Sequence, residues 1–180
     1  MSRRVKLILA ALIVAASGFL AIGLYGITQQ SDSAAAPTEQ SLIPKFEAKD
    51  APPVLGTTLD GEPFDLADYR GTPVVLNFWA SWCGPCRREL PALAAFAKAN
   101  PEIQVIGIDY QDDVEAARTF AAENGATWPS VVDDGPIGAA YEVPGLPATY
   151  LIDAQGRIVE RLLGEVTEAT LNEQLTVLTQ

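Results

Sequence analysis

The chain of 180 residues contains two cysteines, Cys83 and Cys86, which lie two residues apart. An apolar run of strand length at residues 74–79 precedes them, and residues 84–99, which have helical apolar spacing, follow. At the N-terminus of a helix, free backbone N–H groups and the macrodipole stabilise a thiolate. We therefore predict that Cys83 is an exposed nucleophile at that N-terminus. Cys86, one turn further on, is predicted to be the buried resolving thiol that attacks a mixed disulfide.

Two structural roles for the cysteine pair are weaker interpretations. A structural zinc site takes four ligands, usually cysteine and histidine, whereas this chain has no histidine and no third cysteine. A disulfide that closes so short a loop would add far less stability than the roughly 3 kcal/mol expected for a 15-residue loop. The residues thus indicate thiol redox chemistry, with no metal and no cofactor.

The first 27 residues have the composition of a membrane anchor. Arg3, Arg4 and Lys6 precede Leu7–Ile27, a stretch of 21 residues without a charge. That length spans the hydrocarbon core of a bilayer as a helix, and the preceding positive charges keep the N-terminus in the cytoplasm. We predict one uncleaved transmembrane helix in the cell membrane, with the C-terminal domain on the extracytoplasmic (periplasmic) side. The alternative is a cleaved signal peptide, which needs a shorter apolar core.

Composition divides the rest of the chain into a tether and a domain. Residues 28–45 are polar and alanine-rich without periodicity, which predicts a flexible tether. Residues 46–180 are long enough for one domain with an ordinary core. After residue 27 the chain carries nine basic and 23 acidic residues, a net charge of −14. Such a surface disfavours nucleic acid as a partner, because binding needs basic groups that displace counterions.

The domain alternates segments typical of strands and of helices. Strand-length apolar runs occur at residues 103–108, 148–152 and 158–162, and the last two flank a turn that contains Gly156. Helical spacing is found at 112–124 and near the C-terminus. These units predict an α/β domain in which helices cover both faces of a central mixed sheet. The remaining predicted segments are a strand at 62–66, an extended segment at 128–132, a short helix at 137–141, and a final helix with Leu171, Leu175 and Leu178.

The sequence around the cysteines resembles a known active site. The run from Asn77 to Pro91, Asn-Phe-Trp-Ala-Ser-Trp-Cys-Gly-Pro-Cys-Arg-Arg-Glu-Leu-Pro, looks like that of a thioredoxin-fold protein. More narrowly, it is similar to the TlpA, ResA and CcmG (DsbE) group of membrane-tethered, extracytoplasmic thiol-disulfide oxidoreductases, from about Pro52 to the C-terminus. The resemblance implies a thioredoxin-like fold with the TlpA-type internal insertion, a helix and a strand within residues 103 to about 132.

The resemblance also implies a docking site beside the cysteines. Pro147 matches the family's cis-proline loop, where the backbone of Leu146 would hold a partner segment against Cys83 in the manner of strand addition. Trp82, next to Cys83 on the turn, is expected to add a docking surface. Trp79 is expected to lie in the core.

Glu89 is the third candidate for catalysis. On a helical projection it borders the apolar stripe headed by Cys86, and it matches the acidic residue that ResA-like members place near their cysteines. The position of the buried aspartate of thioredoxins is taken here by Asn77, which cannot accept a proton from a thiol. The prediction is a partly buried carboxylate with a raised pKa that moves protons to and from Cys86. The alternative is a surface glutamate that stabilises the helix.

The expected function is disulfide exchange with cysteine pairs on exported proteins. The resemblance implies a reductant in cytochrome c maturation, with apocytochrome c or another exported cysteine-pair protein as substrate. A membrane thiol carrier resembling CcdA or DsbD would supply the electrons. The alternatives are a TlpA-like periplasmic disulfide oxidase and a non-catalytic binding module. Copper delivery and peroxidase activity are disfavoured, because histidine and a threonine-containing peroxide site are lacking.

Overall fold

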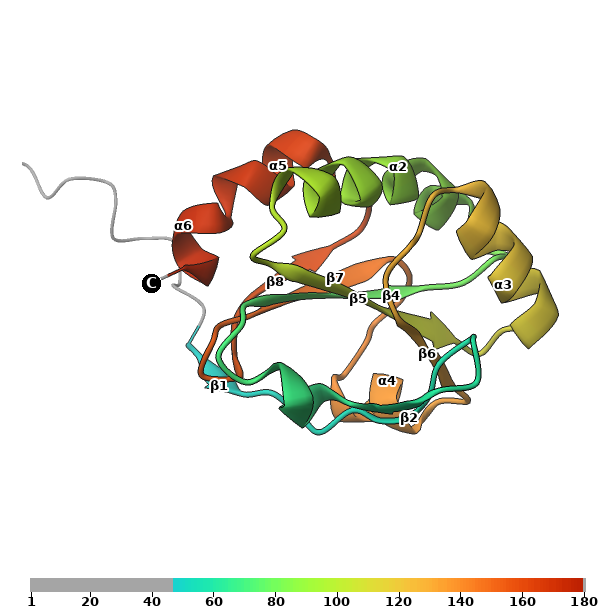
Figure 1. Cartoon of the computed structure of the whole chain (residues 1–180), viewed down its shortest axis with the longest axis horizontal. Coiled ribbons are helices and arrows are strands. Elements are labelled where there is room, and N and C mark those ends of the chain that lie inside the picture. The colour runs from blue at the N-terminus through green and yellow to red at the C-terminus, as the bar shows by residue number, and fades with distance from the viewer. Residues whose placement is uncertain (1–46, 180) are drawn as a thin grey trace, which may run out of the picture. The chain divides into compact units, whose positions relative to one another are not determined.

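A mixed six-stranded sheet forms the centre of the computed structural model, which describes residues 47–179 (Figure 1). Its strands are β1 (Lys49–Asp50), β4 (Val74–Trp79), β5 (Gln104–Tyr110), β6 (Ser130–Asp133), β7 (Ala148–Ile152) and β8 (Arg157–Leu163). They lie in the order β1–β8–β7–β4–β5–β6. β4, β5 and β6 are parallel to one another, whereas β7 is antiparallel to β4 and β8. The predicted mixed sheet is thus confirmed.

The helices lie on both sides of this sheet, but unequally. They are α2 (Gly84–Ala99), α3 (Val114–Glu123), α4 (Pro136–Ala140), α5 (Glu168–Glu173), α6 (Leu175–Leu178) and the 3-10 helix η2 (Leu66–Tyr69). Figure 1 shows α2, α3, α5 and α6 over one face, with the short α4 on the other. The latter face also carries a small antiparallel sheet of β2 (Leu55–Thr57) and β3 (Pro63–Asp65). The strand predicted at 62–66 is β3, so it belongs to this second sheet.

The alternation of side chains along β4 separates two layers of the core. All six residues of β4 are buried, as expected of a central strand with helices on both sides. Phe78 packs with Ile108 and Tyr150 on the face that carries α4. Trp79 points to the other face and packs with residues of α2 and α3. β4 therefore leads directly from the core into the segment that holds the cysteines.

The end of β5 and the C-terminal helix differ most clearly from the sequence predictions. β5 continues to Tyr110, two residues beyond the predicted end, because Asp109 pairs with Trp79 and remains buried in the sheet. The predicted C-terminal helix is divided at Gln174 into α5 and α6, while Leu171 and Leu178 are buried as expected. The unit β5–α3–β6 supplies the helix and strand expected within residues 103–132.

The predicted transmembrane helix at 1–27 and the predicted tether at 28–45 lie outside the described residues. Within residues 47–179, no helix has the length and apolarity needed to cross a membrane.

Candidate active site

Cys83 and Cys86 lie at the N-terminus of α2, as predicted. Cys83 is the N-cap residue, and Cys86 lies in the first turn, one residue after Pro85. The two sulfurs form a disulfide with a Cα–Cα distance of 5.3 Å. Cys83 Sγ also accepts a hydrogen bond from the backbone N–H of Cys86 at 3.2 Å. The same helix-end amide can stabilise a thiolate on Cys83 once the disulfide is reduced.

The prediction that Cys83 is exposed is wrong for this oxidised state. Its side chain is 4% exposed, against 0% for Cys86. The bond to Cys86 and the contact with its amide turn the Cys83 sulfur back over the first turn of α2. Both cysteines belong to a buried cluster with Trp79 and Leu90. Cys83 is still the more accessible of the two sulfur-bearing residues, which keeps it the better candidate for the nucleophile.

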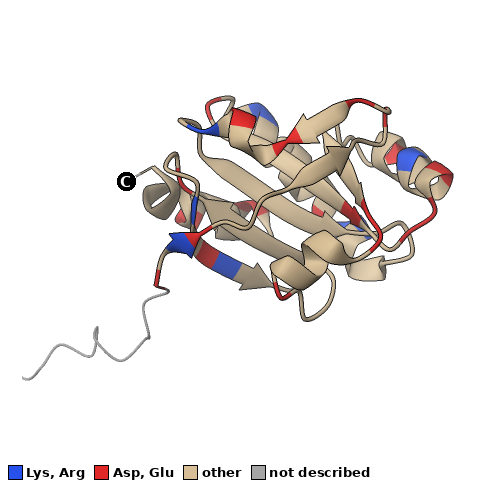
Figure 2. Cartoon of the chain, turned by 90° about the horizontal axis from the view of Figure 1, so that it is seen from below, with Lys and Arg blue, Asp and Glu red and all other residues tan. Residues whose placement is uncertain are grey.

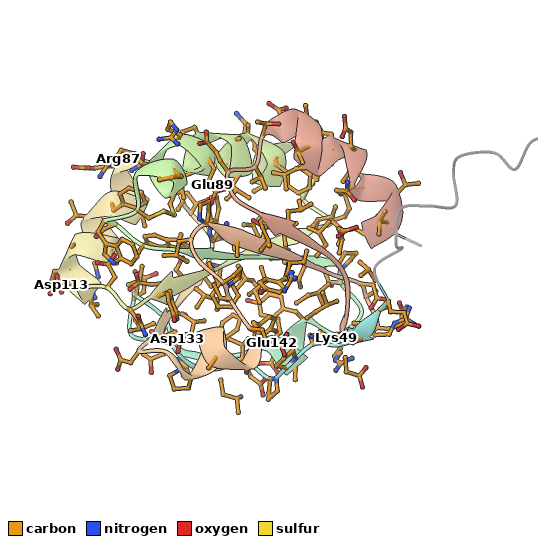
Figure 3. The ribbon with its side chains drawn as sticks, turned by 180° about the vertical axis from the view of Figure 1, so that it is seen from behind. Lys49, Arg87, Glu89, Asp113, Asp133 and Glu142 are labelled. Carbon is orange, nitrogen blue, oxygen red and sulfur yellow. A yellow bond between two sulfur atoms is a disulfide. The ribbon has the colours of Figure 1, made fainter. Side chains whose placement is uncertain are left out.

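Glu89 lies one turn after Cys86 on α2 and is fully buried. Figure 3 shows it between α2 and the sheet, whereas Arg87 lies on the outer side of the helix. Its Oε1 accepts a hydrogen bond from Asn77 Nδ2 at 2.9 Å, and its Oε2 accepts one from the backbone N–H of Val166 at 3.0 Å. The alternative of a surface glutamate is therefore wrong.

Burial raises the pKa of Glu89 to about 7. The two hydrogen bonds that it accepts favour the carboxylate and oppose this rise, while the nearby charge of Glu165 adds to it. A carboxyl group that is half protonated near neutral pH can both take and give a proton. Because residues three apart on a helix are neighbours, the buried residues Glu89 and Cys86 lie on the same side of α2.

Asn77 connects this carboxyl group to the strand that follows the proline loop. It pairs with Thr149 across β4 and β7, and its Nδ2 also donates to Thr149 Oγ1 at 3.1 Å. Within the described residues, Asn77 Oδ1 has no hydrogen-bond partner. Glu89 is thus held by groups from β4 and from the segment before α5.

The Leu146–Pro147 peptide bond is cis, as the resemblance implied. Leu146 is half-buried and packs against the cluster that contains both cysteines. The backbone N–H of Gly164 donates to Pro147 O at 3.0 Å. Among residues 47–179, no backbone hydrogen bond uses the N–H or C=O of Leu146. These two groups are available to pair with an extended partner segment.

The two tryptophans on either side of the β4–α2 turn lie as predicted. Trp82 is 63% exposed, and its Nε1 donates to Gln111 O at 3.2 Å. Trp79 is buried and stacks on Phe120 with ring centroids 5.4 Å apart. Trp82 therefore offers an apolar ring to a partner next to Cys83, whereas Trp79 contributes to the core.

The loop between β5 and α3 belongs to the site, which the sequence analysis did not predict. Asp112 Oδ1 accepts a hydrogen bond from Ser81 Oγ at 2.9 Å, and Asp112 Oδ2 accepts one from the Ser81 backbone N–H. Together with the bond between Trp82 and Gln111, these contacts attach the residues before Cys83 to that loop. The signal in the sequence was Asp109, an acidic residue directly after an apolar run, with Asp112 and Asp113 a few residues further on. The structure shows Asp109 buried.

These features define a class of protein. A cysteine pair two residues apart at the N-terminus of a helix, in a thioredoxin-like α/β fold with a cis-proline beside it, is the site of a thiol-disulfide oxidoreductase. The model of the AhpC/TSA family matches residues 40–161, and the chain belongs to this family.

Individual relatives agree with this class. Over 134 residues the chain is 34% identical to the thiol-disulfide oxidoreductase ResA of Bacillus thuringiensis (strain Al Hakam), which covers 73% of this chain and 78% of the relative. Over 163 residues it is 35% identical to the thiol:disulfide interchange protein HelX of Rhodobacter capsulatus, with 88% of each chain covered. A solved structure of a secreted Mycobacterium tuberculosis disulfide oxidoreductase homologous to Escherichia coli DsbE has a TM-score of 0.63 and 34% identity, with 69% of this chain and 96% of that one covered.

Proposed function

We propose that this oxidoreductase works as a reductant of cysteine pairs on exported proteins, with apocytochrome c as the first candidate substrate. Cys83 as thiolate attacks a substrate disulfide and forms a mixed disulfide. Cys86 then attacks Cys83 Sγ, which releases the substrate as a dithiol and leaves the Cys83–Cys86 disulfide. Two electrons pass to the substrate, and its two sulfurs take up two protons.

The observation that carries this proposal is the place of Glu89. Its carboxyl group is buried one turn after Cys86 and has a pKa of about 7. The resolving step needs Cys86 as a thiolate, although its burial disfavours that charge. A neighbouring carboxylate that accepts the thiol proton lowers the barrier to this step. Glu89 therefore takes the role of general base during substrate reduction and of general acid when the disulfide is reduced again.

The charges around the cysteines support the reducing direction. Glu89 follows Cys86, and the carboxylate of Asp112 binds the turn before Cys83. Negative charge nearby disfavours a thiolate and so disfavours the reduced pair, whereas strong oxidants stabilise their reduced form. Figure 2 shows acidic residues, in red, spread over many of the loops and helices of this domain, with fewer basic residues, in blue, among them.

The docking site and the N-terminal residues support the choice of partners. Trp82 and the backbone of Leu146 would bind an extended segment that carries the substrate cysteines. The resemblance to the ResA and CcmG group supports apocytochrome c as that substrate and a carrier resembling CcdA or DsbD as the electron donor. The uncharged stretch Leu7–Ile27 supports a single-pass membrane anchor with the domain outside the cytoplasm.

The reduction potential of the cysteine pair tests the direction. The full chain is equilibrated with defined ratios of reduced and oxidised dithiothreitol or glutathione, and the fraction of disulfide is measured. The expected potential lies nearer to the roughly −270 mV of thioredoxin than to the roughly −180 mV of protein disulfide isomerase. A value above about −180 mV would contradict the proposal and favour a TlpA-like oxidase.

Insulin reduction separates an enzyme from a binding module. The full chain should reduce insulin disulfides in the presence of dithiothreitol, and Cys83→Ser should reduce them no faster than dithiothreitol alone. Equal rates for the two proteins would favour the non-catalytic alternative.

A further inference from the structure

A second buried carboxyl group lies close to the redox site, on β5. Strand β5 borders β4 on one side, and β7, which pairs with Asn77, borders it on the other. Asp109 stands opposite Trp79 in the pairing of β4 with β5 and is 1% exposed. Within the described residues, neither of its carboxyl oxygens receives a hydrogen bond from an N–H group or a hydroxyl. A buried carboxylate without donors is costly, so this environment favours the protonated acid.

The neighbour of this acid is the carboxyl group of Asp112, three residues further on. Asp112 is the first of the charged groups that raise the pKa of Asp109, and a hydrogen bond between the two carboxyl groups would require one shared proton. The other charges that act on Asp109 are also negative, from Asp113 at the start of α3 and from Asp134 after β6. Burial, followed by these charges, raises the pKa of Asp109 to about 7. Among the described residues, no lysine or arginine is found among the charges that shift it.

Asp112 in turn holds the turn that precedes the nucleophile. Its two oxygens accept hydrogen bonds from the Ser81 N–H and hydroxyl. Cys83 follows two residues later, and its backbone N–H donates to the carbonyl of Ala80. Asp112 is therefore linked through Ser81 to the turn on which Cys83 is placed.

We propose that Asp109 is a positioning residue for the redox site, and that its proton holds the Asp112 carboxylate against Ser81. When Asp109 loses this proton, the two carboxylates repel each other and the turn at Ser81–Trp82 loosens. This role differs from that of Glu89, because the shared proton is not consumed when the disulfide takes up two electrons and two protons. The inference rests on the oxidoreductase class of the chain and holds for either direction of electron flow.

Amide chemical shifts of the oxidised full chain test this inference between pH 5 and 9, because no cysteine titrates in that state. The Ser81 amide should titrate with Asp109, and the Val166 amide, which binds Glu89, should titrate with Glu89. Asp109→Asn should abolish the inflection at Ser81 and leave that at Val166. Glu89→Gln should abolish the inflection at Val166 and leave that at Ser81, so it is the matched control.

A second variant and a rate measurement keep the test decisive. Asp112→Asn leaves the buried acid in place but removes the charge that contributes most to its raised pKa. The titration midpoint of Asp109 should therefore move to lower pH. The rate of disulfide reduction by dithiothreitol, compared at equal pH, should be equal in Asp109→Asn and the unmodified chain at pH 5.5. At pH 8 the variant should react at least twofold faster, because in the unmodified chain the ionised Asp109 no longer holds Asp112 against Ser81 and Cys83 is less well positioned.

Three results would overturn the inference. They are an inflection at Ser81 that survives in Asp109→Asn, a midpoint unchanged by Asp112→Asn, and a rate ratio that is the same at both pH values. A chain that fails to reduce insulin would still show the Ser81 titration, so the two proposals fail separately.

Discussion

The Asn77 amide donates a hydrogen bond to Glu89 Oε1 at 2.9 Å and thereby joins the strand before the cysteines to the helix after them. The carboxyl group is buried, yet both its oxygens have donors, from Asn77 and from the Val166 backbone. Burial alone would favour the protonated form more strongly, and these two bonds bring the pKa of Glu89 down to about 7. The arrangement keeps a carboxyl group with a pKa of about 7 one turn after Cys86 on α2.

Glu89→Gln should slow the reduction of insulin at pH 7 by on the order of 10²-fold, because the resolving thiol loses its proton acceptor. The fold should be retained: the new amide can accept from the Val166 N–H and donate to Asn77 Oδ1, which has no partner within the described residues. The measurement is the rate as a function of pH, with circular dichroism as the check on folding. An unchanged rate in a folded variant would exclude the proton-exchange role.

The stability of the oxidised domain should fall as the pH rises from about 4 to about 8. Burial raises the pKa of both Glu89 and Asp109 to about 7, above their values of 4.5 and 3.8 in an unfolded chain. The native state therefore binds more protons in this window, and unfolding becomes easier as these protons leave. Each group contributes on the order of 3 kcal/mol.

Urea unfolding of the full chain at pH 5 and pH 8 measures this effect. The double variant Glu89→Gln with Asp109→Asn should lose most of the difference between the two pH values. A domain that is more stable at pH 8 than at pH 5 would contradict the assignment of both buried acids.

Gly107→Ala should destabilise the domain by about 1–3 kcal/mol through overpacking. A Cβ atom at this position of β5 would lie 2.6 Å from Trp79 Nε1 and closer still to Ser130 Oγ. Gly145→Ala is the control, since its Cβ would meet no atom within 4 Å, and its effect should stay within about 0.5 kcal/mol. Thermal or urea unfolding compares the two variants, and equal losses would refute the packing account.

Trp82→Ala should reduce kcat/KM for insulin at least about fivefold, because an exposed tryptophan beside the nucleophile is a typical anchor for a protein partner. Reduction of the variant's disulfide by dithiothreitol, which needs no docking surface, should change less than twofold. Leu55→Ala is the matched control, because Leu55 is 62% exposed, lies in β2 on the other face and should leave both rates unchanged. If Trp82→Ala lowers only the rate of reduction by dithiothreitol and leaves kcat/KM for insulin unchanged, the docking role is disproved.

Periodicity was sufficient to predict the central strands, α2, α3 and the hairpin of β7 and β8. The helices bury one continuous stripe of side chains and the central strands bury both faces, so apolar residues recur with the period of a helix or form an unbroken run. It did not predict the end of β5, because Asp109 is a polar residue in a buried strand. The division of the last helix at Gln174 was likewise not visible in the spacing of its leucines.

The candidate site was predicted only in part, because some of its residues are brought together by the pairing of strands and not by local spacing. Cys83, Cys86 and Glu89 lie on one helix, so helix geometry alone brings them together. Asp112 comes from the loop after β5, and only the pairing of β4 with β5 brings it beside the turn before Cys83. The exposure of Cys83 was mispredicted, because it depends on where the disulfide turns the sulfur.

Trapping of the mixed disulfide tests most directly the claim that Cys83 exchanges disulfides with exported cysteine pairs. The reduced full chain carrying Cys86→Ala is mixed with an apocytochrome peptide whose two haem-attachment cysteines form a disulfide, and the products are identified by mass spectrometry. We predict a covalent adduct on Cys83 that dithiothreitol releases, and no adduct with Cys83→Ala under the same conditions. An adduct that forms equally well on Cys86 in Cys83→Ala, or no adduct with either variant, would contradict this account.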